Sequence, residues 1–383
     1  MKRIVGFFVF LVLINLFFPG FGAETPTEIR TFFSGINSHD LMIDRSGNLW
    51  VANADVNTIT KLNPSGSIDE VIPNIPTTVG LYDTRNLMIQ DVNGSIDVLT
   101  DNGTIVVLDE NGNRVGGSYI PNVNRVIDFA MDASGSLWAA GYWSVDNTCS
   151  YTVPQYESYY DRDEKKWKSR HVCDRTYTYA CPSYGENITL LDPGAMVKGQ
   201  LHFDAHGDFP AQMAADGSGN IWVTQHQRNI IIKLDPFGTT IGKYDVGSSS
   251  EGIALDPSGN VWVGTDAHEI VKLSPTGQIL NRTHLDTRDW KFGPDRVVAD
   301  QAGYVWVANP MNGVVELDPS GRIVASYPMP NPVALAIDAQ RNVWVVNNQS
   351  GGNNLWEIPQ TAMGAQYSPV SKTQSQAAQN EDP

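Results

Sequence analysis

The sequence predicts an all-β protein, a seven-bladed β-propeller of four-stranded antiparallel blades that is closed by the N-terminal strand. Three observations lead to this prediction: a repeated unit with a period near 40 residues, turn residues at fixed places in each copy, and a last copy that lacks one strand. The 10 Trp, 14 Tyr and 13 Phe among 383 residues can supply a large core, which excludes a globally disordered chain.

The repeat is the first of these observations. Residues 41–51 read Leu-Met-Ile-Asp-Arg-Ser-Gly-Asn-Leu-Trp-Val, and residues 253–263 read Ile-Ala-Leu-Asp-Pro-Ser-Gly-Asn-Val-Trp-Val. The same unit surrounds Trp138, Trp222, Trp306 and Trp344. A degenerate copy at 87–112 carries Asp97 in the Trp position and brings the number of copies to seven.

Within each copy the residues predict four short strands. In the copy at 253–285, two apolar runs flank Pro-Ser-Gly-Asn, in which Asp256 can accept backbone N–H groups and Gly259 can adopt a positive φ. A third strand (270–273) ends at Ser-Pro-Thr-Gly, and a fourth follows at 279–285. The periodic Trp residues are therefore expected in the core, and the Asp-x-x-Gly segments as turns rather than calcium loops.

The two ends of the repeat zone explain how the ring closes. The last copy has three strands (334–338, 343–346 and 355–358) and then becomes rich in Gln, Ser and Ala. The segment 28–33 supplies the missing strand. We therefore expect a propeller over 28–359 and a disordered tail over 360–383.

The first 23 residues have a basic start, a 15-residue apolar run and small residues near Ala23, which is typical of a secretory signal peptide. The apolar run is shorter than a bilayer-spanning helix, so no stable membrane span is expected after cleavage. A secreted or periplasmic location follows. The net charge of −16 disfavours a nucleic-acid partner, and the oligomeric state is left open.

Export bears on the three cysteines, which all lie within one insertion. In an oxidising compartment, two of Cys149, Cys173 and Cys181 are expected to form a disulfide. Three pairings exist, and the sequence does not choose among them.

The phrase Asp-x-x-Gly-Asn-x-Trp-Val, followed by Ile-x-Lys-Leu-Asp-Pro-x-Gly, resembles the NHL repeat and the streptogramin (virginiamycin B) lyase-like β-propeller family. This resemblance covers nearly the whole repeat zone. It implies a seven-bladed fold and, in the enzymes of the family, a divalent metal with Glu ligands and a His base on one face.

The chain departs from the lyase pattern at the ends of the second strands. Lyase blades carry a Glu three residues after the Trp, whereas no residue at these seven positions is acidic here: Asn53, Thr100, Gly141, Gln225, Thr265, Asn309 and Asn347. Hard divalent cations prefer carboxylate oxygens. No cofactor is therefore expected, except for Mg²⁺ or Ca²⁺ if the protein is an enzyme.

The insertion at 144–186 lies between the second and third strands of blade three. It holds the cysteines, seven Tyr including Tyr159 and Tyr160, and Trp167 in the basic run 165–171. A ligand-binding loop and a disulfide-linked decoration both fit it, as long loops are usually functional or disordered. The basic run follows Asp161, Asp163 and Glu164, which favours a self-neutralised loop.

Another candidate site is the segment His202-Phe-Asp-Ala-His206-Gly-Asp208 between blades three and four. Alternate polar residues share one side of an extended strand and can act as metal ligands or as an acid and base. Ordinary polar loop residues are the competing interpretation. His226, Asp266 and His268 lie on neighbouring loops.

Two functional hypotheses follow. The first is an exported binding module that holds a small molecule or a protein on the loop face bearing the insertion, through Tyr159, Tyr160, Trp167, Gln225, His226, Asp266, His268, Asn309 and Asn347. The alternative is a streptogramin lyase-like or lactonase-like enzyme acting on cyclic esters. In that case His206 is the catalytic base, and Asp208 and Glu251 hold the metal.

Overall fold

The computed structural model describes residues 29–360, apart from 33, 36–37, 55, 77–86, 101–102, 121–124, 146–147, 181–182, 194–195, 204–208, 227, 286–293, 295, 310–312 and 348–353. At some strand positions, most of them in the insertion, only the backbone is described. The described part contains no helix with the length and hydrophobicity that a bilayer crossing requires.

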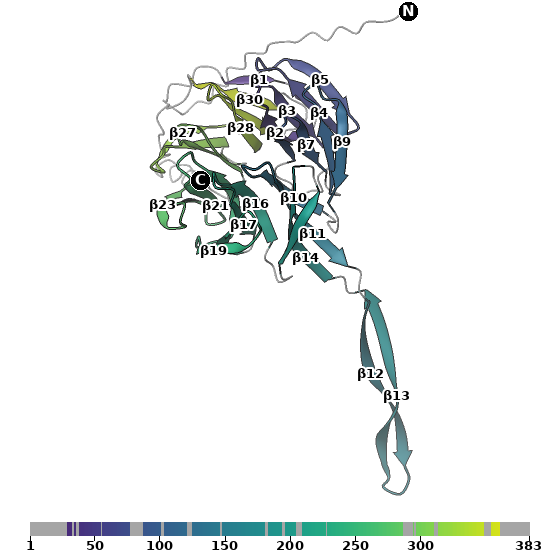
Figure 1. Ribbon diagram of the computed structural model, residues 1–383. Coiled ribbons are helices and arrows are strands. Elements are labelled where there is room, and N and C mark those ends of the chain that lie inside the picture. Colours follow the sequence, from purple (N-terminus) through teal and green to yellow (C-terminus); the bar gives the residue numbers. More distant parts are fainter. Residues whose placement is uncertain are drawn as a thin grey trace, which may run out of the picture.

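Seven four-stranded antiparallel sheets form the ring shown in Figure 1. Blade one comprises β2 (Ser38–Ile43), β3 (Leu49–Asn53), β4 (Thr58–Leu62) and β5 (Ile68–Pro73). Blade two comprises β6 (Met88–Gln90), β7 (Ile96–Leu99), β8 (Thr104–Leu108) and β9 (Arg114–Tyr119). Blade three comprises β10 (Arg125–Met131), β11 (Leu137–Val145), β14 (Ser183–Leu191) and β15 (Val197–Phe203). Blades four and five comprise β16 (Phe209–Ala215), β17 (Ile221–His226), β18 (Ile230–Leu234) and β19 (Thr240–Asp245); and β20 (Ser250–Leu255), β21 (Val261–Thr265), β22 (Glu269–Leu273) and β23 (Ile279–His284). Blades six and seven comprise β24 (Arg296–Ala299), β25 (Val305–Asn309), β26 (Gly313–Leu317) and β27 (Ile323–Tyr327); and β28 (Pro332–Ile337), β29 (Val343–Asn347), β30 (Leu355–Ile358) and β1 (Arg30–Phe32).

The predicted closure by the N-terminal strand is confirmed. Strand β1 pairs antiparallel with β30, with Thr31 opposite Trp356, so the start of the propeller completes its last blade. Phe32 stacks on Trp344 with ring centroids 5.4 Å apart, and Arg30 forms an ion pair with Glu357 at 3.6 Å. The ring therefore closes through backbone pairing and side-chain packing together.

The turn between the first and second strands of a blade is built around its Asp. In blade one, Asp44 Oδ1 accepts the N–H groups of Ser46 and Asn48, at 2.9 and 2.8 Å. Asp44 Oδ2 accepts the indole Nε1–H of Trp50 at 2.9 Å, and Gly47 takes the positive φ that closes the turn. One carboxylate therefore both shapes the hairpin and orients the core Trp.

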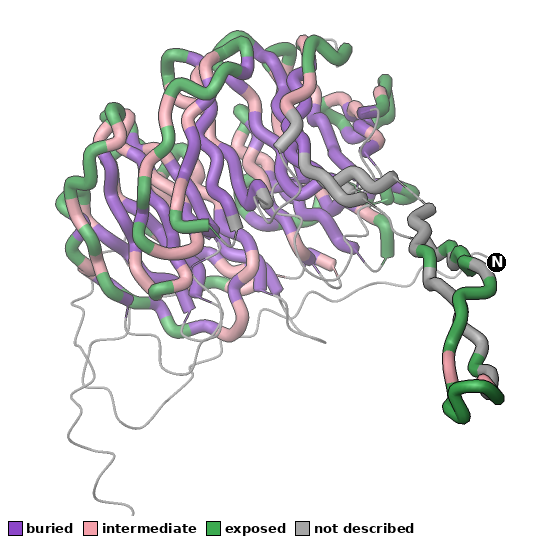
Figure 2. Tube along the Cα trace, turned by 90° about the horizontal axis from the view of Figure 1, so that it is seen from below, coloured by how far each residue is buried: buried purple, intermediate pink, exposed green. Residues whose placement is uncertain are grey.

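The predicted core positions of the repeated Trp residues are confirmed. Each is at most 1% exposed: Trp50, Trp138, Trp222, Trp262, Trp306 and Trp344. Each packs against the next blade, as Trp50 does against Leu87 and Ile96 of blade two. Figure 2 shows these buried strands through the ring. A blade thus buries its apolar face only against its neighbour.

The Lys of the third strand links neighbouring blades. Lys272 lies over the Trp262 ring, 4.6 Å from its centroid, and its Nζ donates a hydrogen bond to Pro319 O in the next blade. Lys233 repeats the arrangement over Trp222 and donates to Pro275 O. A cation over an indole face is attracted to the ring electrons, so each Lys stabilises a seam between blades.

The insertion is an antiparallel ribbon rather than an irregular loop. Strands β12 (Thr148–Asp161) and β13 (Lys166–Ala180) pair only with each other, and β11 and β14 extend beyond the blade toward them. The 14 residues of β12 span about 48 Å at 3.4 Å per residue. The ribbon projects away from the blades (Figure 1), and its described residues are mostly exposed (Figure 2).

Blade two departs from the repeat at the Trp position. Asp97 is 5% exposed there, opposite Val107, and burial together with the nearby Asp91 raises its pKa to about 7. Folding therefore favours the protonated carboxyl. The stability that this group contributes is complete below its unfolded pKa of 3.8 and is lost as the pH rises through 7.

We expect the substitution Asp97→Asn to remove this pH dependence. Between pH 4 and pH 8 the free energy of unfolding should fall by up to about 4 kcal/mol more in the wild type than in the variant, because each unit of pKa shift is worth about 1.4 kcal/mol. Urea unfolding across that pH range measures the difference. The exposed Asp109, whose pKa is lowered by its hydrogen bonds from Asn113, is the matched Asp→Asn control and should not reproduce the effect. Equal pH profiles for wild type and Asp97→Asn would contradict a neutral buried carboxyl.

Candidate functional site on the loop face

The second strands end and the first strands begin on one face, which also carries the insertion; we call it the loop face. Polar residues at the second-strand ends are all buried there, with at most 3% exposed: Asn53, Thr100, Gln225, Thr265, Asn309 and Asn347. Buried polar groups require hydrogen-bond partners. How each of these side chains is satisfied therefore separates structural positions from candidate binding positions.

Asn53 in blade one is fully satisfied by its own blade. Its Oδ1 accepts the hydroxyl of Ser38 at 2.7 Å, and its Nδ2 donates to Thr60 Oγ1 at 2.9 Å. Ser38 Oγ also accepts a hydrogen bond from Nδ2 of Asn354, whose Oδ1 accepts the N–H of Ser34. This network crosses from blade seven to blade one and serves the ring closure.

Asn347 occupies the equivalent position in blade seven, but its amide has no partner within the part of the chain that the structure describes. Both Nδ2 and Oδ1 are buried without a hydrogen bond, and the residue is 0% exposed. The register explains the difference from blade one. Pro332 stands where blade one has Ser38, and Trp356 stands where it has Thr60, so the fold supplies no matching hydroxyl.

Arg296 contacts the strand that pairs with Asn347. Its Nε donates to Val333 O at 3.0 Å, adjacent to Pro332, which pairs with Asn347. Asp40 lies in blade one, on the other side of blade seven. Burial raises its pKa, and the positive charge of Arg296 offsets part of that rise. Blades six, seven and one thus contribute, in that order, a buried guanidinium (Arg296), an unsatisfied amide (Asn347) and a buried carboxyl (Asp40).

Other polar residues of the first strands have structural partners in the neighbouring blade. Asp40 Oδ2 accepts the N–H of Leu87 at 2.7 Å, and Gln212 Oε1 accepts that of Ile253 at 2.9 Å. Asp128 Oδ2 accepts the N–H of Met213 at 2.5 Å. These side chains tie successive blades together.

The predicted binding residues divide into two groups. Trp167 lies near the ribbon tip, whereas Gln225, Asp266, His268, Asn309 and Asn347 lie at the loop face of the blades. Tyr159, Tyr160 and His226 are described only by their backbone, and in register Tyr160 lies opposite Trp167. Sequence reasoning placed Asn347 in the set but missed that it lacks partners. Aligning blade seven with blade one, Pro332 on Ser38 and Trp356 on Thr60, is the signal that reveals it.

The predicted catalytic and metal-binding residues are only partly described. His206 and Asp208 lie outside the described residues, and Glu251 is 2% exposed, with its backbone carbonyl accepting the Thr224 hydroxyl at 2.7 Å. Within the described ranges no three His, Cys, Asp or Glu side chains gather into a set able to hold a metal. The described donors, mainly amides and hydroxyls, do not fit a hard divalent cation.

The basic run of the insertion is neutralised within the ribbon. Lys168 Nζ lies 2.6 Å from Asp161 Oδ2 and 2.5 Å from Glu164 Oε1, and Lys166 Nζ lies 2.5 Å from Glu164 Oε2. Hydrogen bonds from Lys168 lower the pKa of Asp161, and those from Lys166 and Lys168 lower the pKa of Glu164. At the tip of the ribbon, Asp161 and Glu164 therefore neutralise Lys166 and Lys168, as the self-neutralised interpretation predicts.

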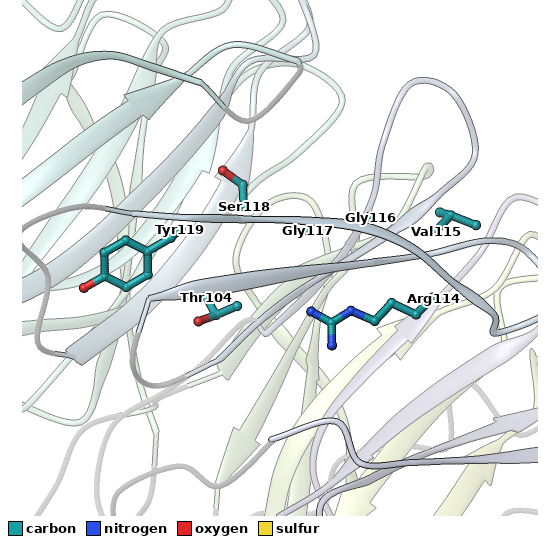
Figure 3. Close-up of a pocket in the computed structure, with 7 residues that line it drawn as sticks. All are labelled: Thr104, Arg114, Val115, Gly116, Gly117, Ser118 and Tyr119. Atoms are coloured by element: carbon teal, nitrogen blue, oxygen red, sulfur yellow. The ribbon is translucent and has the colours of Figure 1, made fainter.

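A shallow groove follows β9 on the outer rim of blade two (Figure 3). It encloses about 630 Å³ and is lined by Thr104, Arg114, Val115, Gly116, Gly117, Ser118 and Tyr119. Ser118 stands where blades four and six carry Tyr244 and Tyr327, which stack on the Trp of their blades at 5.2 and 5.5 Å. Blade two has no aromatic side chain at the Trp position or at the Tyr position, so its outer edge carries less side-chain volume. The groove contains none of the predicted site residues.

Comparisons with known structures establish the fold. A streptogramin B lyase superposes with a TM-score of 0.64 at 16% identity, covering 86% of this chain and 96% of the lyase. The virginiamycin B lyase from Staphylococcus aureus gives 0.64 at 13% identity (86% and 98% covered), and the Pan2 WD40 domain of Neurospora crassa gives 0.56 at 8% (84% and 88%). No sequence-family description matches the chain, and no characterised protein matches it in sequence. The protein thus has a streptogramin lyase-like β-propeller fold.

The contrast between Asn347 and Asn53 makes a stability prediction. We expect Asn347→Leu to raise the free energy of unfolding by about 1–3 kcal/mol, because it removes a buried polar group that has no partner. The matched substitution Asn53→Leu should lower it, because Ser38 and Thr60 then lose their partner. Urea unfolding of both variants tests the pair. Destabilisation of equal size in both would show that the Asn347 amide is satisfied in solution.

The ribbon register restricts the disulfide. Cys149 lies opposite Tyr179 and Cys173 opposite Gln155, six positions further along β12, or roughly 20 Å. Ala180 is seven residues beyond Cys173 on the extended β13, roughly 23 Å away, and Cys181 follows it by one peptide bond. A disulfide needs Cα atoms within about 7 Å. The register therefore excludes both pairings of Cys173.

We predict a Cys149–Cys181 disulfide in the exported protein, although Cys181 itself lies outside the described residues. Mass analysis of a non-reduced digest should find the peptides of Cys149 and Cys181 linked and Cys173 as a free thiol. A linked Cys173 peptide would show that the ribbon register differs from this one.

Proposed function

We propose that the protein is an exported binding module that holds a ligand or partner on the loop face bearing the insertion, with the amide of Asn347 as the central contact. The observation that carries the proposal is that this amide is wholly buried and unpartnered at a position where blade one satisfies its Asn completely. An unmet donor and acceptor costs about 1–3 kcal/mol. A bound polar group would remove that cost.

The surroundings indicate the chemistry of the ligand. A carboxamide offers a donor and an acceptor side by side, which matches the donor and acceptor of another amide. We therefore infer a peptide-like ligand that presents amide and carbonyl groups.

Quinupristin is a suitable first probe, because a structure of an inactive virginiamycin B lyase with this compound has the same fold as the present chain. Isothermal titration calorimetry with quinupristin and with short neutral peptides should detect binding to the wild type. Asn347→Leu should weaken it at least tenfold, since about 1.4 kcal/mol of hydrogen bonding corresponds to that factor. Arg114→Gln on the distant rim of blade two is the control. Equal affinity in the wild type and Asn347→Leu, or no binding by any probe, would count against the proposal.

The lyase-like fold supports a second candidate function, a metal-dependent enzyme that opens cyclic esters with His206 as the base and with Asp208 and Glu251 holding the metal. The same samples test it. Ring opening of quinupristin that requires Mg²⁺ or Ca²⁺ and disappears in His206→Ala would establish the enzyme and displace the binding module. Binding without ring opening is the outcome we expect.

A further inference from the structure

The two faces of the β12–β13 ribbon differ sharply in charge. Side chains alternate along a strand, and residues opposite each other in register share a face. The lysine face carries Lys166, Lys168, Arg170 and Arg175 from β13, with Asp161 from β12. The Trp167 face carries Trp167, Ser169, Ser158, Thr152, Thr176 and Thr178, together with His171 and Asp174.

The Trp167 face is a neutral surface on an acidic protein. Its charged groups within the described residues are His171 and Asp174, which pair with each other at 2.6 Å. Thr152 and Thr176 share a hydrogen bond at 3.0 Å across the strands. Trp167 is 72% exposed, so a large apolar side chain stands in water on this face. Exposed aromatics of this kind are the usual anchors of protein interfaces.

The edges of the ribbon are unsuited to pairing with another strand. Pro154 in the middle of β12 has no N–H to donate, and β13 carries the charged residues Lys166, Lys168, Arg170 and Arg175. Natural sheets use both devices to prevent edge-to-edge association. A partner must therefore approach the ribbon through a face.

Among the described elements, none pairs with or covers the two-stranded ribbon. Isolated ribbons are marginally stable in water, and the ion pairs at its tip are exposed and worth little. Ordering each backbone residue costs about 1–2 kcal/mol. A surface that buries one face would offset that cost.

We propose that the Trp167 face is a homodimer interface that binds the same face of a second copy of the chain. This inference concerns the ribbon alone and does not depend on the ligand site at Asn347. A half-turn about the long axis of the ribbon exchanges its strands, so β12 of one copy lies over β13 of the other at the same height. Trp167 then faces the position of Tyr160 in the other copy, and Thr176 faces Thr152.

This arrangement matches the character of the face along its length. Near the tip, Trp167 covers the position of Tyr160 in the other copy, and further along the ribbon Thr176 covers Thr152. The charged lysine faces stay in water, where no desolvation opposes association. A two-fold contact of this kind closes on itself and forms a dimer rather than a fibre.

The area of the ribbon sets the strength of the contact. Two strands about 5 Å apart and about 48 Å long present roughly 480 Å² per copy, or about 1,000 Å² in total. Specific interfaces begin near this size. We therefore infer a weak, concentration-dependent dimer. Its salt dependence is diagnostic, because each copy carries a net charge of −16 and the contact itself is neutral, so salt should strengthen association.

Sedimentation equilibrium of the full chain tests the proposal, at 1–200 µM protein and at low and high NaCl. A Cys173→Ser background removes any intermolecular disulfide of that residue. The expected result is a micromolar dimer that tightens with salt and that Trp167→Ser weakens at least tenfold. The double variant Lys166→Gln/Arg170→Gln, which alters only the lysine face, should dimerise like the parent. Circular dichroism confirms that each variant keeps its sheet content.

Three outcomes would overturn the proposal. A monomer throughout this range would show that the ribbon faces some other molecule or only water. A dimer that salt weakens, and that the lysine-face variant disrupts, would place the contact on the opposite face. A dimer unaffected by Trp167→Ser would place it on the blades.

Discussion

One carboxylate per blade, that of the Asp in the first turn, organises most of this structure. In blade one, the two oxygens of Asp44 hold both the turn and the core Trp. In blade five, burial works to raise the pKa of Asp256, but hydrogen bonds from Asn260 and Trp262 outweigh it and hold the pKa below its ordinary value. These hydrogen bonds therefore favour the ionised form of the Asp256 carboxyl, which is the form that accepts them.

The same interaction explains where the blades differ. In blades four and six, Lys233 and Arg341 pair with Oδ2 of Asp216 and Asp300, at 3.0 and 2.5 Å, and the indole N–H groups of Trp222 and Trp306 are left buried without a partner among the described residues. A cation is the stronger competitor for a carboxylate than an indole N–H. Blade two has lost the Trp altogether, and the carboxyl of Asp97 occupies its place.

The fold could be predicted from the sequence because its determinants are local and repeated. The turn Asp, Gly47 and Trp50 lie within seven residues, and this pattern recurs at the blade period, with Asp97 replacing the Trp in blade two and Arg341 replacing the Gly in blade seven. The ribbon was harder to predict, although the alternation Thr-Tyr-Thr-Tyr at 176–179 is a strand pattern, because nothing in the sequence shows that two such stretches pair outside the blades. The site was harder still. That Asn347 lacks partners follows from Pro332 and Trp356, which lie 15 residues before and nine after it and meet it only through the sheet register.

The unpartnered amide of Asn347 lies in blade seven, the blade that closes the ring. Blade seven is assembled from both ends of the propeller, and β1 supplies its outer strand. Its third strand, β30, must therefore carry residues that pack against β1. Trp356 lies opposite Thr31 at the joint and replaces the Thr that satisfies Asn53 in blade one. An Asn that served only the scaffold would gain nothing in such surroundings, since an apolar side chain of similar size would be more stable there. Its presence at the loop-face end of β29 therefore supports the proposal that the amide serves a molecule other than the propeller itself.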